Sequence, residues 1–421
     1  MPTPPSARKR VLVLNQYYWP GVEATANLLT DLCEGLARTY DVEVVTGVLH
    51  EHVHDPRSFP RHGVAIRRVR STAFDRTGLM ARASNYFTYL GFALGDGLFA
   101  RRPDIVLCMT DPPMVGAVGL GVARRFGVPL VVVCQDVFPE TAVKLGRLTN
   151  PLAVGILRAI VGSYLRRADR VVSIGETMSR RLVAKGAPAE RIVVIPNWVD
   201  PAEITPRPRE NAWARDNDLA GRFVVMHSGN VGHAQDLETL VRAAVLLHDL
   251  DRLEILIVGF GARYVALVQL AQDLGATNVR FLPYQPREVL SESLSAADVH
   301  FLGLARGLAG YVVPSRINGV LSAGRPVIVA ADPESEPARL VETAGCGVVV
   351  PPGDARAVAA AIRHAYDGDL ELEALGAAGR GWIERHRSRD AAIARYRELL
   401  EALLAGGGRA AGLRRGTAAR R

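Results

Sequence analysis

Two segments in the last third of the chain combine glycine turns, a helix start and an arginine. Residues 259–271, GFGARYVALVQLA, follow a buried-strand run and carry Arg263, and residues 310–330, GYVVPSRINGVLSAGRPVIVA, open a short helix at Arg316. Backbone N–H groups and an arginine at the carboxyl edge of a parallel sheet are typical of an anion site, because unpaired amides and the helix dipole converge there. We therefore predict a pocket for a nucleotide diphosphate, with these contacts: Gly259, Gly261, Arg263, Ser315 and Arg316.

Two carboxylates follow an apolar strand in the first half of the chain. The run 130–134 predicts a buried strand, so Asp136 emerges at its carboxyl edge, and Glu140 lies in the first turn of the next helix. Asp136 could orient an acceptor hydroxyl or the donor sugar. Glu140 is equally consistent with a plain helix-start acid. We take both as candidate catalytic residues.

The first strand-to-helix loop supplies a further group of candidates. Gly21 would let the backbone approach the diphosphate or an acceptor closely, because glycine has no Cβ in the way. An ordinary turn glycine is the alternative interpretation. Glu23 and Asn27 lie just beyond Gly21 and are predicted on the acceptor side.

The elements that must position these residues alternate as strand and helix along the chain, which predicts parallel α/β sheets. A helix is expected at 24–39 and a helical segment at 380–404. The fold class is therefore α/β, with two Rossmann-like domains that face a cleft, a common place for a ligand. The predicted strands are 11–14, 42–45, 105–109, 130–134, 171–174 and 192–195, then 223–226, 255–258, 279–282, 299–302, 327–330 and 348–350.

This pattern divides the chain into six parts. A length of 421 residues suits two domains, each with its own core, and prolines near residue 205 punctuate a polar stretch between them. The parts are a flexible N-terminus (1–9), an N-terminal Rossmann-like acceptor domain (10–203), a linker (204–210), a C-terminal Rossmann-like donor-binding domain (211–378), C-terminal helices (379–405) and a disordered basic tail (406–421).

The composition is that of a globular protein, 48% hydrophobic and 22% charged, which excludes wholesale disorder. The net charge of +8 favours anionic partners, and nearly all the cations are arginine, since only Lys9, Lys144 and Lys185 are lysine. Nucleic acid is not expected as a partner, because the arginines are scattered and no aromatic-rich strand offers a platform for bases. Four widely spaced cysteines are typical of reduced core packing, which fits the cytoplasm.

Residues 79–99 are rich in aromatic residues and glycine, with Arg82 and the pair Arg101 and Arg102 at their ends. One interpretation is a helix at a membrane interface, where aromatic and arginine side chains are favourable. The other is a core-facing helix of the first domain. The first would bring a cytoplasmic protein into peripheral contact with the inner face of the membrane and favour a lipid-linked acceptor.

Six motifs in a fixed order resemble one enzyme family. Each is weak alone, because Gly-x-Gly turns are common, but six in this order and spacing are specific. Residues 10–400 resemble the retaining GT-B glycosyltransferases of family 4, particularly those that build bacterial surface polysaccharides. The motifs are QYYWPGVEATANLLTDLCEGLA, QDVFPETAVKLG, IPNWVD, HSGNVGHAQDLETLVRAA, GFGARY and the segment 310–330.

The resemblance implies transfer of a sugar from a nucleoside-diphosphate donor to a glycan or polyprenyl-linked acceptor, with retention of the anomeric configuration. The donor would lie mostly on the second domain and the acceptor on the first, and the C-terminal helix would pack back toward the first domain. Negative charge develops on the departing diphosphate, so catalysis needs cations and N–H dipoles arranged around it in advance. The diphosphate oxygen itself can take the acceptor's proton. No metal or other cofactor is expected.

The chain departs from the family pattern at four positions. Tyr311 and Gly319 stand where most relatives carry two glutamates, the second of which usually holds the ribose hydroxyls. Asn230 and Gln235 stand where an arginine and a lysine are expected. Recognition of the ribose must therefore differ, and two cations are missing.

Arg316 is our candidate for the compensating cation, and Arg263 is the second choice. An arginine fork can bind a diphosphate in bidentate fashion. The alternative is that Arg316 is only an exposed helix-start residue. His227 and His233 flank the loop after the first strand of the second domain, and His233 is the favoured ligand contact. The loop residues retained as donor contacts are Gly229, Asn230 and Gln235.

Two other functions remain compatible with these residues. A nucleotide-sugar epimerase could use a similar two-domain scaffold without an acceptor. A catalytically inactive subunit that binds a sugar nucleotide would explain the missing glutamates and cations.

Overall fold

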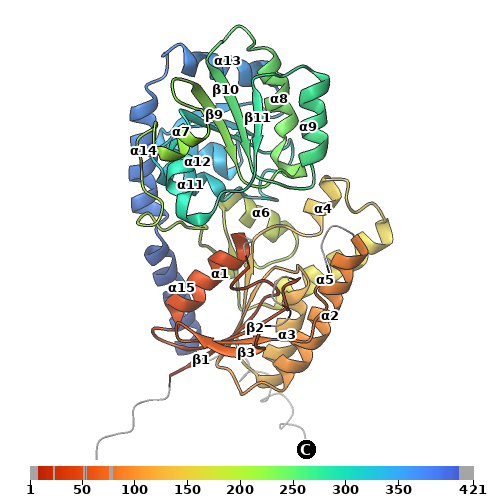
Figure 1. The fold of residues 1–421 in the computed structure, drawn as a ribbon. Helices are drawn as coiled ribbons and strands as arrows, with labels where there is room; N and C mark the ends of the chain where they lie inside the picture. The colour runs from red at the N-terminus through yellow and green to blue at the C-terminus, as the bar shows by residue number, and fades with distance from the viewer. Residues whose placement is uncertain (1–7, 22–23, 51–52, 54, 75–78, 407–421) are drawn as a thin grey trace, which may run out of the picture. The chain divides into compact units, whose positions relative to one another are not determined.

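The computed structural model describes residues 8–21, 24–50, 53, 55–74 and 79–406, which fold as two compact units (Figure 1). Unit 1 contains the described residues of 1–143, 148–196 and 390–421. Unit 2 contains residues 144–147 and 197–389. The chain therefore leaves unit 1 for four residues, returns to it, and comes back a last time near its C-terminus.

The strands of unit 1 are β1 (Arg10–Leu14), β2 (Asp41–Thr46), β3 (Ser58–Arg61), β4 (Val64–Arg68), β5 (Ile105–Met109), β6 (Leu130–Cys134), β7 (Arg170–Ser173) and β8 (Ile192–Val194). They form one sheet in the order β3-β4-β2-β1-β5-β6-β7-β8. All neighbours are parallel except β3 and β4. Every residue of β5 and β6 is buried, as expected for central strands of a parallel sheet covered on both faces.

The helices of unit 1 are α1 (Ala24–Leu36), α2 (Leu79–Leu98), α3 (Val115–Phe126), α4 (Glu140–Lys144), α5 (Pro151–Arg167), α6 (Glu176–Ala184), η2 (Ala189–Arg191) and α15 (Arg389–Ala405). Helices α2 and α3 pack side by side (Figure 1). Helix α15 packs on α1, where a Cβ on Gly35 would lie 2.5 Å from Ile393 Cδ1. The absence of a side chain at Gly35 thus allows the close approach, and the predicted return of the C-terminal helix to the first domain is confirmed.

The strands of unit 2 are β9 (Phe223–Ser228), β10 (Leu253–Val258), β11 (Val279–Leu282), β12 (Val299–Gly303), β13 (Val327–Ala330) and β14 (Gly347–Val350). They form a fully parallel sheet in the order β11-β10-β9-β12-β13-β14. The chain runs outward from β9 to one edge and then from β12 to the other. The carboxyl ends of β9 and β12 therefore flank a topological switch point, where α/β sheets usually bind ligands.

The helices of unit 2 are α7 (Ala212–Asp216), η3 (His233–Gln235), α8 (Leu237–Val245), α9 (Tyr264–Asp273), η4 (Arg287–Val289), α10 (Leu290–Ser295), α11 (Arg316–Ser322), α12 (Glu336–Ala344), α13 (Ala355–Tyr366) and α14 (Leu372–His386). Among the described residues, no helix combines the length and hydrophobicity that crossing a bilayer requires.

The predicted α/β class and all twelve predicted strands are present. Three details differ. The β3–β4 hairpin was not expected, and the helical segment predicted at 380–404 is two helices, α14 and α15, separated at Arg387 and Ser388. Residues 204–210 are no free linker, since the Thr205 amide donates to Ser291 Oγ at 3.2 Å and Arg209 pairs with Asp298 at 3.0 Å.

The ends of the predicted domains also shift. The change from unit 1 to unit 2 comes between residues 196 and 197, and residues 390–405 belong to unit 1. Arg8 and Lys9, assigned to the flexible N-terminus, donate hydrogen bonds to Ala37 and Asp104. The rest of that segment and nearly all of the predicted tail lie outside the described residues. All four cysteines are buried and free, as predicted for core residues.

Candidate functional site

Two loops at the carboxyl ends of β9 and β10 form one hydrogen-bonded layer in unit 2. The Gly229 amide donates to Val258 O at 2.8 Å, and the Val231 amide donates to Phe260 O at 3.0 Å. The Arg263 amide returns a hydrogen bond to Val231 O at 2.9 Å. The loop after β9 is therefore held against the start of the predicted glycine segment 259–271, beside the switch point.

Glycines allow these two loops to lie in direct contact. Gly229 and Gly259 have φ of 137° and 139°, a conformation that other residues rarely adopt. A Cβ on Gly259 would overlap the Gly229 carbonyl oxygen, and one on Gly261 would overlap the Val231 carbonyl oxygen. The missing side chains at Gly259 and Gly261 therefore allow the two loops to approach each other closely.

Arg316 reaches this layer from the first residue of α11. Its Nη1 lies 2.8 Å from His227 Nε2 and 3.4 Å from the carbonyl oxygen of Asn230. A Cβ on Gly229 would lie 2.8 Å from the same Nη1, so the guanidinium rests against the glycine backbone. No carboxylate of the described residues is within salt-bridge distance of Arg316. The guanidinium is therefore a cation without a counter-ion, beside unhindered backbone.

His227, which the sequence analysis ranked below His233, is the histidine that contacts Arg316. It is fully buried, and burial, followed by the charge of Arg316, holds its pKa well below the ordinary value. A neutral imidazole can accept the Arg316 hydrogen bond at Nε2 with its proton on Nδ1. Burial also lowers the pKa of Arg316, to about 10. His233, the histidine favoured from sequence, is exposed, whereas His227 ends the buried run of β9, which was the available signal.

Two other predicted donor contacts have partners inside unit 2. Arg263 donates from Nε and Nη2 to Glu238 Oε1, at 2.9 and 2.7 Å. Gln235 Oε1 accepts a hydrogen bond from the Gly232 amide at 3.0 Å, which stabilises the loop between these two residues. The Asn230 side chain is exposed. The Ser315 side chain makes no hydrogen bond that caps α11.

Asp136 lies in unit 1, two residues beyond the end of β6. Its side chain is partly buried, and burial raises the pKa of the carboxyl to about 7. Within the part of the chain that the structure describes, no hydrogen bond or ion pair holds this carboxyl. A carboxyl with a near-neutral pKa and no internal partner at a strand end can exchange a proton with, or orient, a bound hydroxyl.

Glu140 is held differently. Its carboxylate accepts from Lys185 Nζ at 2.5 Å and from Arg158 Nε at 3.0 Å. Burial raises its pKa, but the hydrogen bonds and charge of these two cations outweigh that effect and leave the pKa lowered. The structure therefore favours the plain helix-start acid over a group that exchanges protons.

The remaining candidates of unit 1 lie in and beyond the first loop. The Gly21 amide donates to Tyr18 O at 2.9 Å, which is an ordinary turn. Asn27 is exposed on α1. Glu23 lies outside the described residues, so its predicted role stays a prediction.

Comparison with known proteins identifies this pair of units. Residues 24–198 match the glycosyl transferase 4-like domain, and residues 210–382 match the glycosyl transferases group 1. The chain is a family 4 GT-B glycosyltransferase.

The similarity of the glycosyltransferase to its relatives covers most of its length. It is 28% identical to the probable glycosyltransferase WbjE of Pseudomonas aeruginosa over 72% of this chain and 76% of that protein. It is 29% identical to the putative colanic acid biosynthesis glycosyl transferase WcaI of Escherichia coli, over 63% of this chain and 66% of that protein. The crystal structure of Anabaena HepE in complex with UDP and glucose has the same fold, with a TM-score of 0.73, 16% identity, and coverage of 94% of this chain and all of that one.

At the two positions where most relatives carry glutamates, the glycosyltransferase makes packing contacts. Lys144 Nζ lies 4.9 Å from the centroid of the Tyr311 ring, a cation–π contact within unit 2. A Cβ on Gly319 would meet Ile204 and Leu294 at 3.5 and 3.7 Å. The position that usually holds a ribose-binding glutamate therefore faces apolar side chains.

Gly259→Ala is expected to destabilise unit 2 of the glycosyltransferase by roughly 1–3 kcal/mol more than Gly275→Ala. Both glycines have positive φ, but a Cβ at Gly275 meets nothing within 4 Å, whereas one at Gly259 meets the Gly229 carbonyl. Thermal unfolding of both variants checks this. Equal shifts in melting temperature would mean that the two loops do not touch as described.

Asp136→Asn is expected to stabilise unit 1 by roughly 1–3 kcal/mol above pH 7 and to change little near pH 4. The pKa of Asp136 is raised, so the folded state binds the proton more tightly than the unfolded chain, and that contribution is lost as the pH rises toward about 7. Unfolding across this range measures it, with the exposed Glu398→Gln as a control. Parallel pH profiles for wild type and Asp136→Asn would contradict the raised pKa.

Proposed function

We propose that this glycosyltransferase moves a sugar from a nucleoside-diphosphate donor to a glycan or lipid-linked acceptor, with retention of configuration, in the assembly of a surface polysaccharide. The single observation that carries the donor assignment is Arg316. Its guanidinium lies among buried groups, against bare backbone, and has no carboxylate partner among the described residues. A diphosphate is the kind of ligand that neutralises such a cation.

The chemistry of the leaving group explains the rest of the unit 2 arrangement. Negative charge grows on the diphosphate as the bond to the sugar breaks, and a fixed cation in a site with little water stabilises that charge strongly. His227 accepts a hydrogen bond from Arg316 without adding charge, so it orients the guanidinium and leaves its full charge for the ligand. The glycines at 229, 259 and 261 let Arg316 and the two loops pack closely at this sheet edge.

Asp136 has the properties proposed for the acceptor side. Its ionised form could accept a hydrogen bond from an acceptor hydroxyl and align it for attack. Because the departing diphosphate can take the proton, Asp136 need not act as a strong base.

The named relatives support the same substrate classes. The name of WcaI refers to colanic acid biosynthesis, and the HepE crystal structure contains UDP and glucose. We extend both to this chain as the expected kind of product and the expected kind of donor.

Arg316→Ala is expected to weaken the binding of a nucleoside diphosphate by roughly 1.5–3 kcal/mol, because it removes a charged hydrogen-bond donor from the site. Calorimetry with UDP and GDP on the full chain measures this. Arg263→Ala is the matched control, since Arg263 already pairs with Glu238, and its effect should be much smaller. Unchanged affinity in Arg316→Ala, or an equal loss in both variants, would overturn the assignment.

Asp136→Asn is expected to keep the affinity for the nucleoside diphosphate and to lower turnover by about 100-fold or more. NMR of the product's anomeric proton in the wild-type reaction reports whether the configuration is retained. A product of inverted configuration would contradict the proposed reaction. So would donor epimerisation without an acceptor, and a normal rate in Asp136→Asn would remove this residue from the site.

A further inference from the structure

The outward face of α2 in unit 1 carries apolar side chains where charge is normally found. Phe87 and Phe99 are 65% and 90% exposed, and Phe92 and Leu94 are exposed beside them. The only charged residues of α2 are Arg82 and Asp96, and Asp96 is paired with Arg67 at 3.9 Å. A solvent-facing helix is usually polar on this side, and a contiguous exposed apolar face marks an interaction surface. We call these four residues, Phe87, Phe92, Leu94 and Phe99, the α2 face.

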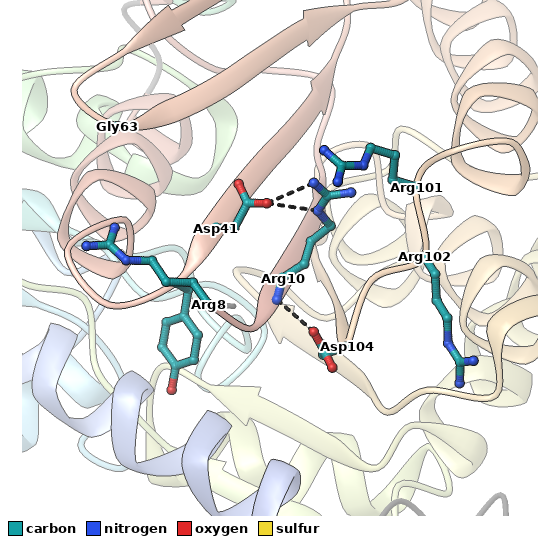
Figure 2. A pocket seen from close by; sticks show the side chains of 8 residues that line it. Arg8, Arg10, Asp41, Gly63, Arg101, Arg102 and Asp104 are labelled. Atoms are coloured by element: carbon teal, nitrogen blue, oxygen red, sulfur yellow. Dashed lines mark hydrogen bonds and ion pairs between the residues drawn. The ribbon is translucent and has the colours of Figure 1, made fainter. Parts of the chain in front are cut away.

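Two arginines follow the last residue of the α2 face in the sequence. Arg101 and Arg102 come two and three residues after Phe99, so their backbones lie within about 11 Å of it. Both line a pocket of about 610 Å³ with Arg8 and Arg10 (Figure 2).

The two acids of this pocket are already used. Asp41 accepts from Arg10 Nε and Nη2 at 3.1 and 2.8 Å, and Asp104 accepts from the Arg10 amide at 2.8 Å (Figure 2). Asp104 also accepts from Lys9 Nζ at 3.1 Å. No carboxylate of the described residues pairs with Arg8, Arg101 or Arg102. The four arginines and two aspartates of the pocket therefore leave it with an excess of positive charge.

The end of α3 adds two more exposed arginines at the same end of the surface. Helices α2 and α3 run parallel, since Leu94 faces Gly121 and a Cβ on Gly97 would meet Val122. The C-terminal residues Arg124 and Arg125 therefore lie beside the end of α2. They too are exposed and without a carboxylate partner within the described chain. We call Arg101, Arg102, Arg124 and Arg125 the arginine end.

We propose that the α2 face and the arginine end together dock unit 1 onto a bilayer that contains anionic lipids. Phenylalanine rings enter the boundary between headgroups and acyl chains, and arginines bind the lipid phosphates, one of which the pocket of Figure 2 can take. The excess of positive charge beside the apolar strip fits a lipid surface, because a bilayer offers hydrocarbon and negative charge side by side. None of these residues belongs to the candidate donor or acceptor site, so the proposal stands apart from the proposed reaction.

Sedimentation of the full chain with vesicles tests this surface. Wild type is expected to bind vesicles of phosphatidylcholine with phosphatidylglycerol, to bind pure phosphatidylcholine far more weakly, and to lose binding as salt is added. The double variant Phe92→Ser/Phe99→Ser should bind roughly tenfold more weakly or worse, because it removes two apolar anchors. Arg101→Gln/Arg102→Gln should bind roughly tenfold more weakly and show less dependence on salt.

Matched controls change the same residue types on unit 2. Leu246→Ser/Val265→Ser removes exposed apolar side chains, and Arg242→Gln/Arg339→Gln removes exposed arginines. Both should bind vesicles as wild type does. All variants should keep the wild-type melting temperature and affinity for a nucleoside diphosphate, which shows that they are folded.

Three results would overturn the proposal. The first is that wild type fails to bind the anionic vesicles. The second is that the variants of the α2 face and the arginine end bind like wild type, which would mean that other residues attach the chain. Light scattering without lipid could instead show a dimer that Phe92→Ser/Phe99→Ser dissociates, which would assign the face to a second copy. No sugar donor is used, so these outcomes are independent of the proposed reaction.

Discussion

The site in unit 2 depends on one uncompensated charge, the Arg316 guanidinium. Holding a desolvated cation without a counter-ion costs free energy, and a folded protein accepts that cost only where surrounding groups fix the charge. Here a neutral histidine and a backbone carbonyl do so, and the glycines beside them let the guanidinium and the two loops approach closely. Binding of the proposed diphosphate would relieve that cost and would couple the stability of these loops to occupancy of the site.

The strands were predictable because a central strand of a parallel sheet is a continuous apolar run, such as IVLCM in β5 and LVVVC in β6. The β3–β4 hairpin was not, since its strands are short, polar in part and joined through His62 and Gly63, both with positive φ. The break between α14 and α15 has no strong stop signal either. Both features are set by tertiary pairing and not by local pattern.

The candidate site likewise contains residues with local sequence signals and residues whose contacts are long-range. Gly229, Gly259, Gly261 and Arg316 could be proposed from the sequence because glycine turns and helix starts are local signals. The ion pairs of Arg263 and Glu140 could not be predicted from the sequence. Their partners, Glu238 and Lys185, lie 25 and 45 residues away along the chain. His227 stands at the end of a buried run, but its contact with Arg316 joins residues 89 positions apart, which no local pattern reports.

The path of the chain has a practical consequence for anyone who wishes to study one unit alone. The backbone passes from one unit to the other four times, at 143–144, 147–148, 196–197 and 389–390. A single cut near residue 200 therefore yields no autonomous half. The N-terminal fragment would leave bare the α1 surface that Ile393 covers, and the C-terminal fragment would lose the lysine that stacks on Tyr311. Circular permutation or co-expression of overlapping fragments would be needed instead.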